Sequence, residues 1–100
     1  MEYPNFYGSF NGKKEIVASA FSKKGWISRK CTFVDFEIKN DWSELIIEGE
    51  EPECLIHGFV DDMDKNINCI VSILESVVKE WSIEIYNEER KYLREIKSST

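Results

Sequence analysis

Residues 61–81 read DDMDKNINCIVSILESVVKEW, and this stretch decides the fold of the chain. Its apolar residues recur at spacings of three and four, which is the spacing of one face of an α-helix. The sequence therefore predicts an amphipathic helix over residues 64–80, packed through Ile70, Leu74 and Val77. The acidic residues that precede it suit the positive end of the helix dipole. The full apolar stripe is Ile67, Ile70, Leu74, Val77, Val78 and Trp81.

The segments before this helix alternate as strands. Cys54–Val60 is apolar on both of its alternating faces, which predicts a central strand covered on both sides. Trp42–Glu48 is predicted to pair with it, joined by an exposed acidic loop at residues 49–52. Cys31–Lys39 is a further strand, and the Asn40-Asp41 turn joins it to Trp42–Glu48 as an antiparallel pair.

Two segments leave an alternative open. Asn5–Phe10 reads as a strand, after which Asn11-Gly12 is a strong hairpin signal. Glu15–Phe21 is then either a returning strand or a helix capped by Asn11 and ended at Gly25, and the apolar spacing favours the helix. Ser82–Tyr86 alternates as a strand. Lys91–Ile96 is either its antiparallel partner or a short terminal helix, and the strand is favoured because it follows the turn at residues 87–90 directly.

These elements predict one α+β domain over residues 1–100. We expect a mostly antiparallel sheet with one main amphipathic helix packed on one face and a second short helix near the N-terminus. A chain of 100 residues is long enough for one core.

The three cysteines and the N-terminal residues indicate a cytoplasmic protein. The odd cysteine count, without paired spacing, is typical of small buried apolar residues in a reducing compartment. Met1 is not followed by a basic and apolar leader, and no apolar run is long enough to span a membrane. We therefore expect no membrane association.

The charge is distributed unevenly along the chain. The net charge is −6, and residues 41–64 hold nine acidic residues and no Lys or Arg. Such a surface repels phosphate backbones, so nucleic acid is not an expected partner. A cationic protein is the favoured partner. The alternative interpretation is a solvated face that keeps a small protein soluble.

No catalytic site can be assembled from the residues present. His57 is the single histidine, and Cys54, the nearest cysteine, stands three positions before it on the same strand. Residues three apart on a strand point to opposite faces, so the two side chains cannot meet. We expect His57 to be half-buried and bonded to the backbone, and the chain not to be an enzyme.

No metal or cofactor motif is present either. Asp62, Asp64 and Asn66 resemble the start of a calcium-binding loop. The sixth position is Ile67 instead of glycine, and the twelfth is Ile73 instead of a bidentate glutamate. These acidic residues are expected to cap the helix, and neither a metal nor a cofactor is expected.

The candidate partner-binding residues lie at the two ends of the predicted central strand. One acidic cluster precedes the strand and the other follows it, so the two could clasp a basic partner. Trp42 and Trp26 are candidate interface anchors, although packing at the edge of the core is the favoured interpretation for each. Trp81 is expected in the core. The binding candidates are Glu48, Glu50, Glu51, Asp61, Asp62, Asp64 and Trp42.

From Asp41 onwards the chain resembles small bacterial immunity proteins of the contact-dependent growth inhibition or polymorphic toxin type. The resemblance is carried by residues 42–47 (WSELII), by Ile56-His57-Gly58 running into an acidic helix start, and by residues 82–86 (SIEIY). It implies a cytoplasmic inhibitor that holds an acidic face to the basic C-terminal toxin domain of a secreted effector, commonly a nuclease. The alternative is a small interaction or accessory domain without a toxin partner, which could form a homodimer.

Overall fold

Seven strands form one antiparallel sheet in the computed structural model, which describes residues 4–31 and 34–98. The strand order is β2-β3-β4-β5-β1-β6-β7, so the N-terminal strand β1 is inserted between β5 and β6. This arrangement confirms the predicted α+β class. The strands are β1 (Phe6–Asn11), β2 (Ile27–Lys30), β3 (Phe36–Asn40), β4 (Ser43–Glu50), β5 (Glu53–Val60), β6 (Trp81–Tyr86) and β7 (Tyr92–Lys97).

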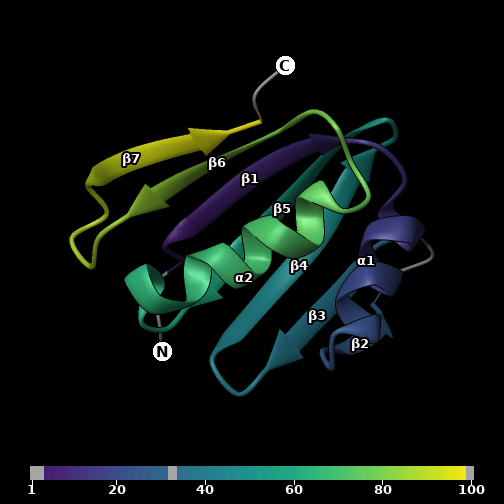
Figure 1. Ribbon diagram of the computed structural model, residues 1–100, viewed down its shortest axis with the longest axis horizontal. Helices are drawn as coiled ribbons and strands as arrows, with labels where there is room; N and C mark the ends of the chain where they lie inside the picture. The colour runs from purple at the N-terminus through teal and green to yellow at the C-terminus, as the bar shows by residue number, and fades with distance from the viewer. Residues whose placement is uncertain (1–3, 32–33, 99–100) are drawn as a thin grey trace.

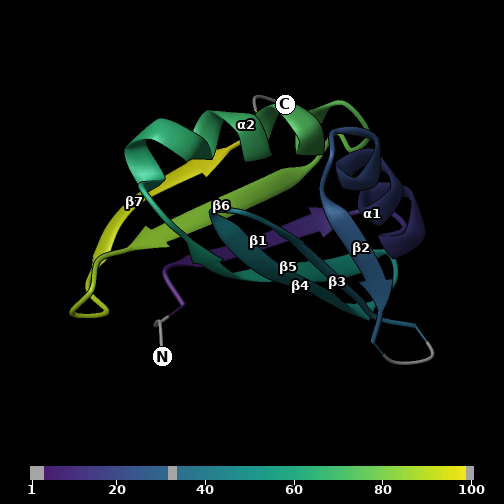
Figure 2. The ribbon, with the colours of Figure 1, turned by 90° about the horizontal axis from the view of Figure 1, so that it is seen from below.

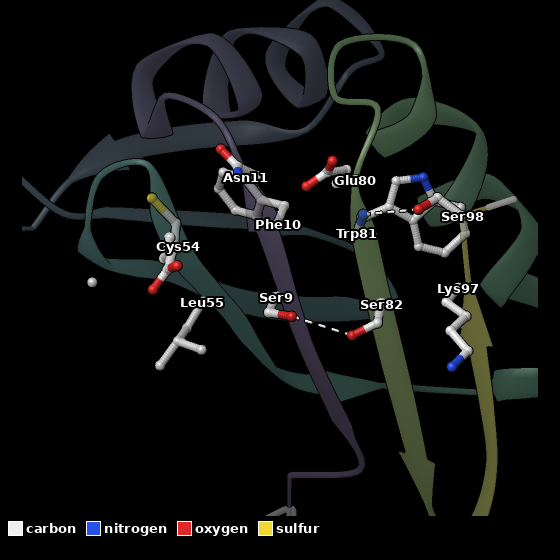
Figure 3. A pocket seen from close by; sticks show the side chains of 12 residues that line it. Ser9, Phe10, Asn11, Cys54, Leu55, Glu80, Trp81, Ser82, Lys97 and Ser98 are labelled. Carbon is white, nitrogen blue, oxygen red and sulfur yellow. Dashed lines mark hydrogen bonds between the residues drawn. The ribbon is translucent and has the colours of Figure 1, made fainter. Parts of the chain in front are cut away.

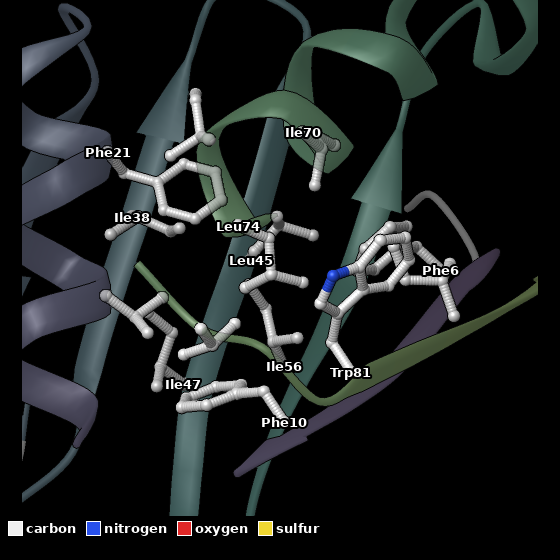
Figure 4. Packing of buried hydrophobic residues seen from close by; sticks show 14 of the residues in the cluster. Phe6, Phe10, Phe21, Ile38, Leu45, Ile47, Ile56, Ile70, Leu74 and Trp81 are labelled. Carbon is white, nitrogen blue, oxygen red and sulfur yellow. The ribbon is translucent and has the colours of Figure 1, made fainter. Parts of the chain in front are cut away.

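Both helices lie on the same face of the sheet, as Figures 1 and 2 show. The helix α1 (Lys14–Lys23) packs on β2, β3 and β4, and α2 (Met63–Glu75) packs on β5 and against α1. The core fills the space between the helices and the sheet (Figure 4). The opposite face of the sheet is not covered by any described element, and we call it the open face.

The helix α2 is shorter than the sequence predicts. Ile70 and Leu74 are fully buried, as expected, but the helix ends at Glu75. A tight turn then brings the chain back to β6, and the Ser76 hydroxyl donates to the Ile73 carbonyl at 2.6 Å. This turn buries Val78 and leaves Val77 38% exposed, so the prediction that Val77 packs in the core is wrong.

The helix α1 confirms the favoured interpretation of residues 15–21, and the hairpin alternative is wrong. Asn11 ends β1 instead of capping the helix, and the N-cap residue Lys13 makes no side-chain capping bond. Gly25 follows the helix with a φ of 92°, a conformation that glycine adopts without a steric cost. Trp26 is then buried against Phe21.

Residues 27–40 form two strands where the sequence predicted one. β3 begins at Phe36, later than the expected start at Cys31, and residues 32–33 lie outside the described part of the chain. β2 was not predicted. It pairs with β3, and all four of its residues are exposed. A strand with no buried face does not need apolar residues at alternate positions, and this alternation is the signal that identifies a strand from sequence. The strand interpretation of residues 91–96 is confirmed, because β7 pairs antiparallel with β6.

β5 is central in the sheet, but it is covered on one face only. Ile56 is fully buried beneath the helices, whereas Leu55 is 48% exposed on the open face. The prediction that both faces are covered is therefore wrong, since the second layer of the fold is missing. Gly58 has a φ of 152°, and a side chain there would collide with the backbone of Glu44 on β4. Strand pairing at this point therefore requires glycine.

Of the three cysteines, Cys54 is buried and both Cys31 and Cys69 are exposed. The prediction of buried cysteines thus holds for Cys54 alone. Trp81 is buried at the start of β6, as expected. Neither of the two described helices is long and apolar enough to cross a membrane.

Candidate functional site

The predicted binding residues occupy three separate places. Glu48 and Glu50 lie on the open face, because they alternate along β4 with the buried Leu45 and Ile47. Glu48 is opposite Leu55 of β5, and its carboxylate lies 3.5 Å from Nε2 of His57. His57 is half-buried as expected, but its partner is this carboxylate instead of the expected backbone group. The predicted gathering of acidic residues at this end of β5 is thus observed for Glu48 and Glu50.

Glu51 has a structural role within the chain. Its carboxylate accepts the backbone N–H of Lys14 at 2.7 Å, which supplies the cap that α1 lacks locally. The Lys14 ammonium is buried, lies 3.2 Å from a carboxylate oxygen of Asp35 and donates to the Gly49 carbonyl. The turn between β4 and β5 is thereby tied to the start of α1.

The second acidic cluster lies at the opposite end of β5. Asp61 follows Val60, and eight residues of strand at about 3.3 Å each put it about 26 Å from Glu53. Asp62 has a left-handed backbone and makes no side-chain capping bond, so the expected cap is wrong for this residue. Instead, the Asn66 amide donates to the Asp61 carbonyl at 2.7 Å. Asp64 lies 3.9 Å from Arg94 of β7.

Trp42 is half-buried at the edge of the core. Its ring meets that of Trp26 edge to face, with centroids 5.1 Å apart, and Trp26 in turn meets Phe21. This packing matches the favoured interpretation of both tryptophans. Trp42 therefore contributes to packing at the edge of the core.

The open face carries a row of side chains that sequence reasoning did not identify. Strand register aligns Ile46 with His57, His57 with Tyr7, and Tyr7 with Glu84. Tyr7 is 44% exposed, Ile46 37% and Leu55 48%, so apolar surface lies at the centre of the sheet. The signal was present in the alternation of residues 6–10 and 82–86, whose outward positions hold Tyr7, Ser9, Ser82, Glu84 and Tyr86.

Aromatic rings connect four strands across this face. Tyr7 and His57 are nearly parallel, with centroids 6.3 Å apart, and Tyr7 meets Tyr86 edge to face at 5.2 Å. Tyr92 of β7 adds a further ring to this row, with its ring centroid 6.0 Å from that of Tyr86. Aromatic rings of this kind offer apolar area together with polar edges, which favours protein binding.

A groove runs over β1 and β6 where the outward side chains are small. Ser9 and Ser82 form its floor, with their hydroxyl oxygens 3.2 Å apart (Figure 3). A hollow of about 870 Å³ extends from them toward Glu53, Glu80 and Lys97, and a second of about 290 Å³ lies between Tyr7 and Glu84. The two hollows share Ser9, Leu55 and Ser82.

The open face is acidic. Outward positions on the described strands hold more carboxylates than cationic groups, and some are paired across strands, such as Arg29 with Glu37 at 3.4 Å. The acidic side chains surround the apolar centre instead of forming one run. The carboxylates are Glu37, Glu44, Glu48, Glu50, Glu53, Glu84 and Glu95, and the cations are Arg29, Lys39 and Lys97.

Two groups have shifted protonation equilibria. The Tyr86 hydroxyl donates to the Glu84 carboxylate at 2.5 Å, and this bond raises the pKa of Tyr86 above its ordinary value because it stabilises the neutral phenol. Burial raises the pKa of the Cys54 thiol, and the nearby Lys14 partly opposes this effect. Cys54 faces the core and His57 the open face, so the two do not meet, as the strand spacing predicts. Within the described residues, no three His, Cys, Asp or Glu side chains converge as metal ligands.

Comparison of the chain with protein-family models, curated proteins and solved structures found no match.

Proposed function

We propose that this chain is a non-catalytic cytoplasmic inhibitor of the immunity-protein type, which binds the basic toxin domain of a secreted effector. The observation that supports this best is the open face of the sheet, where an exposed apolar and aromatic centre is surrounded by glutamates. A desolvated apolar centre with a charged rim is the usual anatomy of a specific protein interface.

The dimensions of the molecule suit this role. It measures 33 × 32 × 23 Å, and the sheet extends across the two longer axes. A standard interface takes about 800 Å² from each partner, and a face of this extent can supply that area. The proposed site therefore centres on Tyr7, Ile46 and Leu55, with Glu48 and Glu50 retained from the sequence hypothesis.

The acidic rim has a separate task in this proposal. Carboxylates around a binding face attract a basic partner and raise the association rate above a neutral value of about 10⁵–10⁶ M⁻¹s⁻¹. The cluster of Asp61, Asp62 and Asp64 lies beyond the end of β5, farther from the proposed site, so we expect it to contribute less to this attraction than the carboxylates of the open face. A nuclease toxin suits this surface, since its own active site must be positive to hold phosphates.

The direct test is co-purification of the chain with the product of the neighbouring gene, followed by binding kinetics of any complex that forms. We expect Leu55→Asp to weaken the complex at least tenfold, because it places a charge in the apolar centre. The matched control is Val77→Asp, since Val77 is also exposed but lies beside α2. If both variants lose the same affinity, or if Leu55→Asp loses none, the open face is not the binding site.

A charge-reversal arm tests the rim. Glu44, Glu48 and Glu50 changed together to lysine should slow association and flatten its salt dependence between about 0.01 and about 1 M, where the Debye length falls from about 30 to about 3 Å. The same change at Asp61, Asp62 and Asp64 should have a smaller effect. If a folded triple variant of the open face associates at the wild-type rate over the whole salt range, these carboxylates serve solubility only. A toxin that binds outside the open face would contradict the proposal.

A further inference from the structure

The smaller hollow on the open face has a composition that selects one chemical group. Its volume is about 290 Å³, and it lies over β1, β5 and β6, where Ser9, Ser82, Tyr7 and Leu55 are among the residues that line it. This volume is at the lower limit of small-molecule pockets. Taken without the larger hollow, with which it shares Ser9, Leu55 and Ser82, it is of the order of one long side chain.

Glu84 supplies the single carboxylate of this hollow. One of its oxygens, Oε2, accepts the Tyr86 hydroxyl, which fixes the side-chain orientation. No Lys or Arg is among the residues that line the hollow, and His57, which also lines it, is paired with Glu48. No ion pair between described residues includes Glu84. Its negative charge is therefore oriented and not neutralised, which favours a cation from outside the chain.

The aromatic walls favour the same kind of ligand. Tyr7 and Tyr86 both line the hollow and hold each other edge to face at 5.2 Å. The face of an aromatic ring attracts a cation, and this attraction adds to that of a carboxylate nearby. A guanidinium group can stack on a ring while its N–H groups donate to a carboxylate, whereas an ammonium is a strongly hydrated point charge.

We propose that this hollow receives one arginine side chain of the basic partner, with the guanidinium packed against the rings of Tyr7 and Tyr86 and hydrogen-bonded to Glu84. This inference rests on the proposed function for its biological meaning, because it identifies the anchor residue of the partner. The apolar stem of the arginine would lie against Leu55. The site is an arginine-recognition pocket within the open face, which we call the Glu84 pocket.

The first test uses N-acetyl-arginine methylamide as a probe in a backbone-amide NMR titration of the whole chain. We expect saturable shifts confined to residues 7–9, 55–57 and 82–86. N-acetyl-citrulline methylamide has nearly the same shape without the charge and should cause no saturable shift. The corresponding lysine probe, Nα-acetyl-lysine methylamide, should bind several-fold more weakly than the arginine probe. Equal response to citrulline, equal binding of lysine, or shifts spread over the acidic surface would overturn the proposal.

The second test removes the charge and keeps the geometry. Glu84→Gln retains an oxygen that can accept the Tyr86 hydroxyl, and we expect arginine affinity to fall about tenfold, the scale of a charge-assisted hydrogen bond. Glu44→Gln is the matched control, since it makes the same charge change on the same face three strands away. Unchanged amide spectra outside the pocket verify folding of each variant. Equal affinities for the two variants would contradict the pocket.

Failure of this inference and failure of the proposed function are distinguishable. If the toxin domain binds through the open face while Glu84→Gln leaves that complex unchanged and the probe shows no saturable shift, the pocket is wrong and the function stands. If the arginine probe binds at the Glu84 pocket but Leu55→Asp leaves the toxin complex intact, the pocket stands and the proposed surface for inhibition is wrong.

Discussion

The carboxylate of Glu51 accepts the backbone N–H of Lys14 at 2.7 Å, across 37 positions of sequence. A helix that lacks its own N-terminal cap thus takes one from the turn between β4 and β5. The adjoining end of β4 holds the buried Lys14 ammonium through the Gly49 carbonyl. Glu51, which sequence reasoning assigned to a partner, is occupied within the chain.

Glu51→Ala should therefore destabilise the protein by about 0.5–2 kcal/mol, the usual cost of losing a helix N-cap. Glu50→Ala is the control, because Glu50 is adjacent, acidic and exposed on the strand. Urea denaturation measures both free energies of unfolding. Equal small changes, within about 0.5 kcal/mol, would mean that the cap contributes nothing to stability.

Leu74→Ala should cost about 2–5 kcal/mol, because it opens a cavity between α2 and the sheet. Val77→Ala should change stability by less than about 0.5 kcal/mol, since Val77 lies beyond the helix end and is exposed. Thermal or urea unfolding compares the two. A large loss for Val77→Ala would mean that the helix continues to residue 80, as its apolar spacing suggests.

Gly58→Ala should destabilise the sheet by more than Gly25→Ala. Both glycines have a positive φ, but an added carbon at Gly58 meets the Glu44 backbone, whereas one at Gly25 meets nothing within 4 Å. We expect about 1–2 kcal/mol for Gly25→Ala from the left-handed conformation alone. Unfolding free energies decide the order, and a reversed order would show that β4 can move away from β5 at low cost.

Two of the three thiols should react quickly with a disulfide reagent in the native protein. Cys31 and Cys69 are exposed, whereas Cys54 is buried and its pKa is raised by that burial. The thiolate is the reactive form, so Cys54 is protected in two ways. The reagent cannot reach the buried thiol, and the raised pKa keeps that thiol protonated. Stopped-flow thiol titration should give two fast equivalents and a third that appears on unfolding. Loss of a fast equivalent in Cys54→Ala would contradict this.

Tyr86 should ionise above the ordinary tyrosine range, and Glu84→Gln should lower its pKa. The bond to the carboxylate stabilises the protonated phenol in the folded state. Its contribution to stability is therefore complete below the unfolded pKa near 10 and is lost as pH rises through the folded pKa. Ring NMR shifts of Tyr86 follow the titration. Glu95→Gln is the control and should leave this pKa close to that of the wild type.

Much of the fold could be predicted because it depends on local periodicity. The spacing of Ile67, Ile70 and Leu74 identified α2, and the alternation in residues 82–86 identified β6. The predictions fail at positions where the residue pattern does not correspond to the secondary structure. Val77 keeps the helical spacing although the chain has already turned, and β2 is a strand whose residues are all exposed. Neither feature can be recognised from residue type alone.

The candidate site was predicted in part. Sequence reasoning correctly placed Glu48 and Glu50 together, since residues two positions apart on one strand point to the same face. It could not separate Glu51, which caps a distant helix, from its neighbours. It also overlooked Tyr7, Tyr86 and Glu84, because β1 and β6 are adjacent only through long-range pairing and no local pattern links residues almost eighty positions apart.

The sequence by itself determined the alternation of inward and outward side chains, the amphipathic helix and the acidic charge, because each depends on neighbours within a few positions. Only the tertiary structure decided that both helices lie on one face and that β1 lies between β5 and β6. The physical reason is that an outward residue becomes part of a surface only when strand order and layering set what lies beside and above it. The strand order brings Tyr7 beside His57 and Tyr86, and the missing second layer leaves them on the open face.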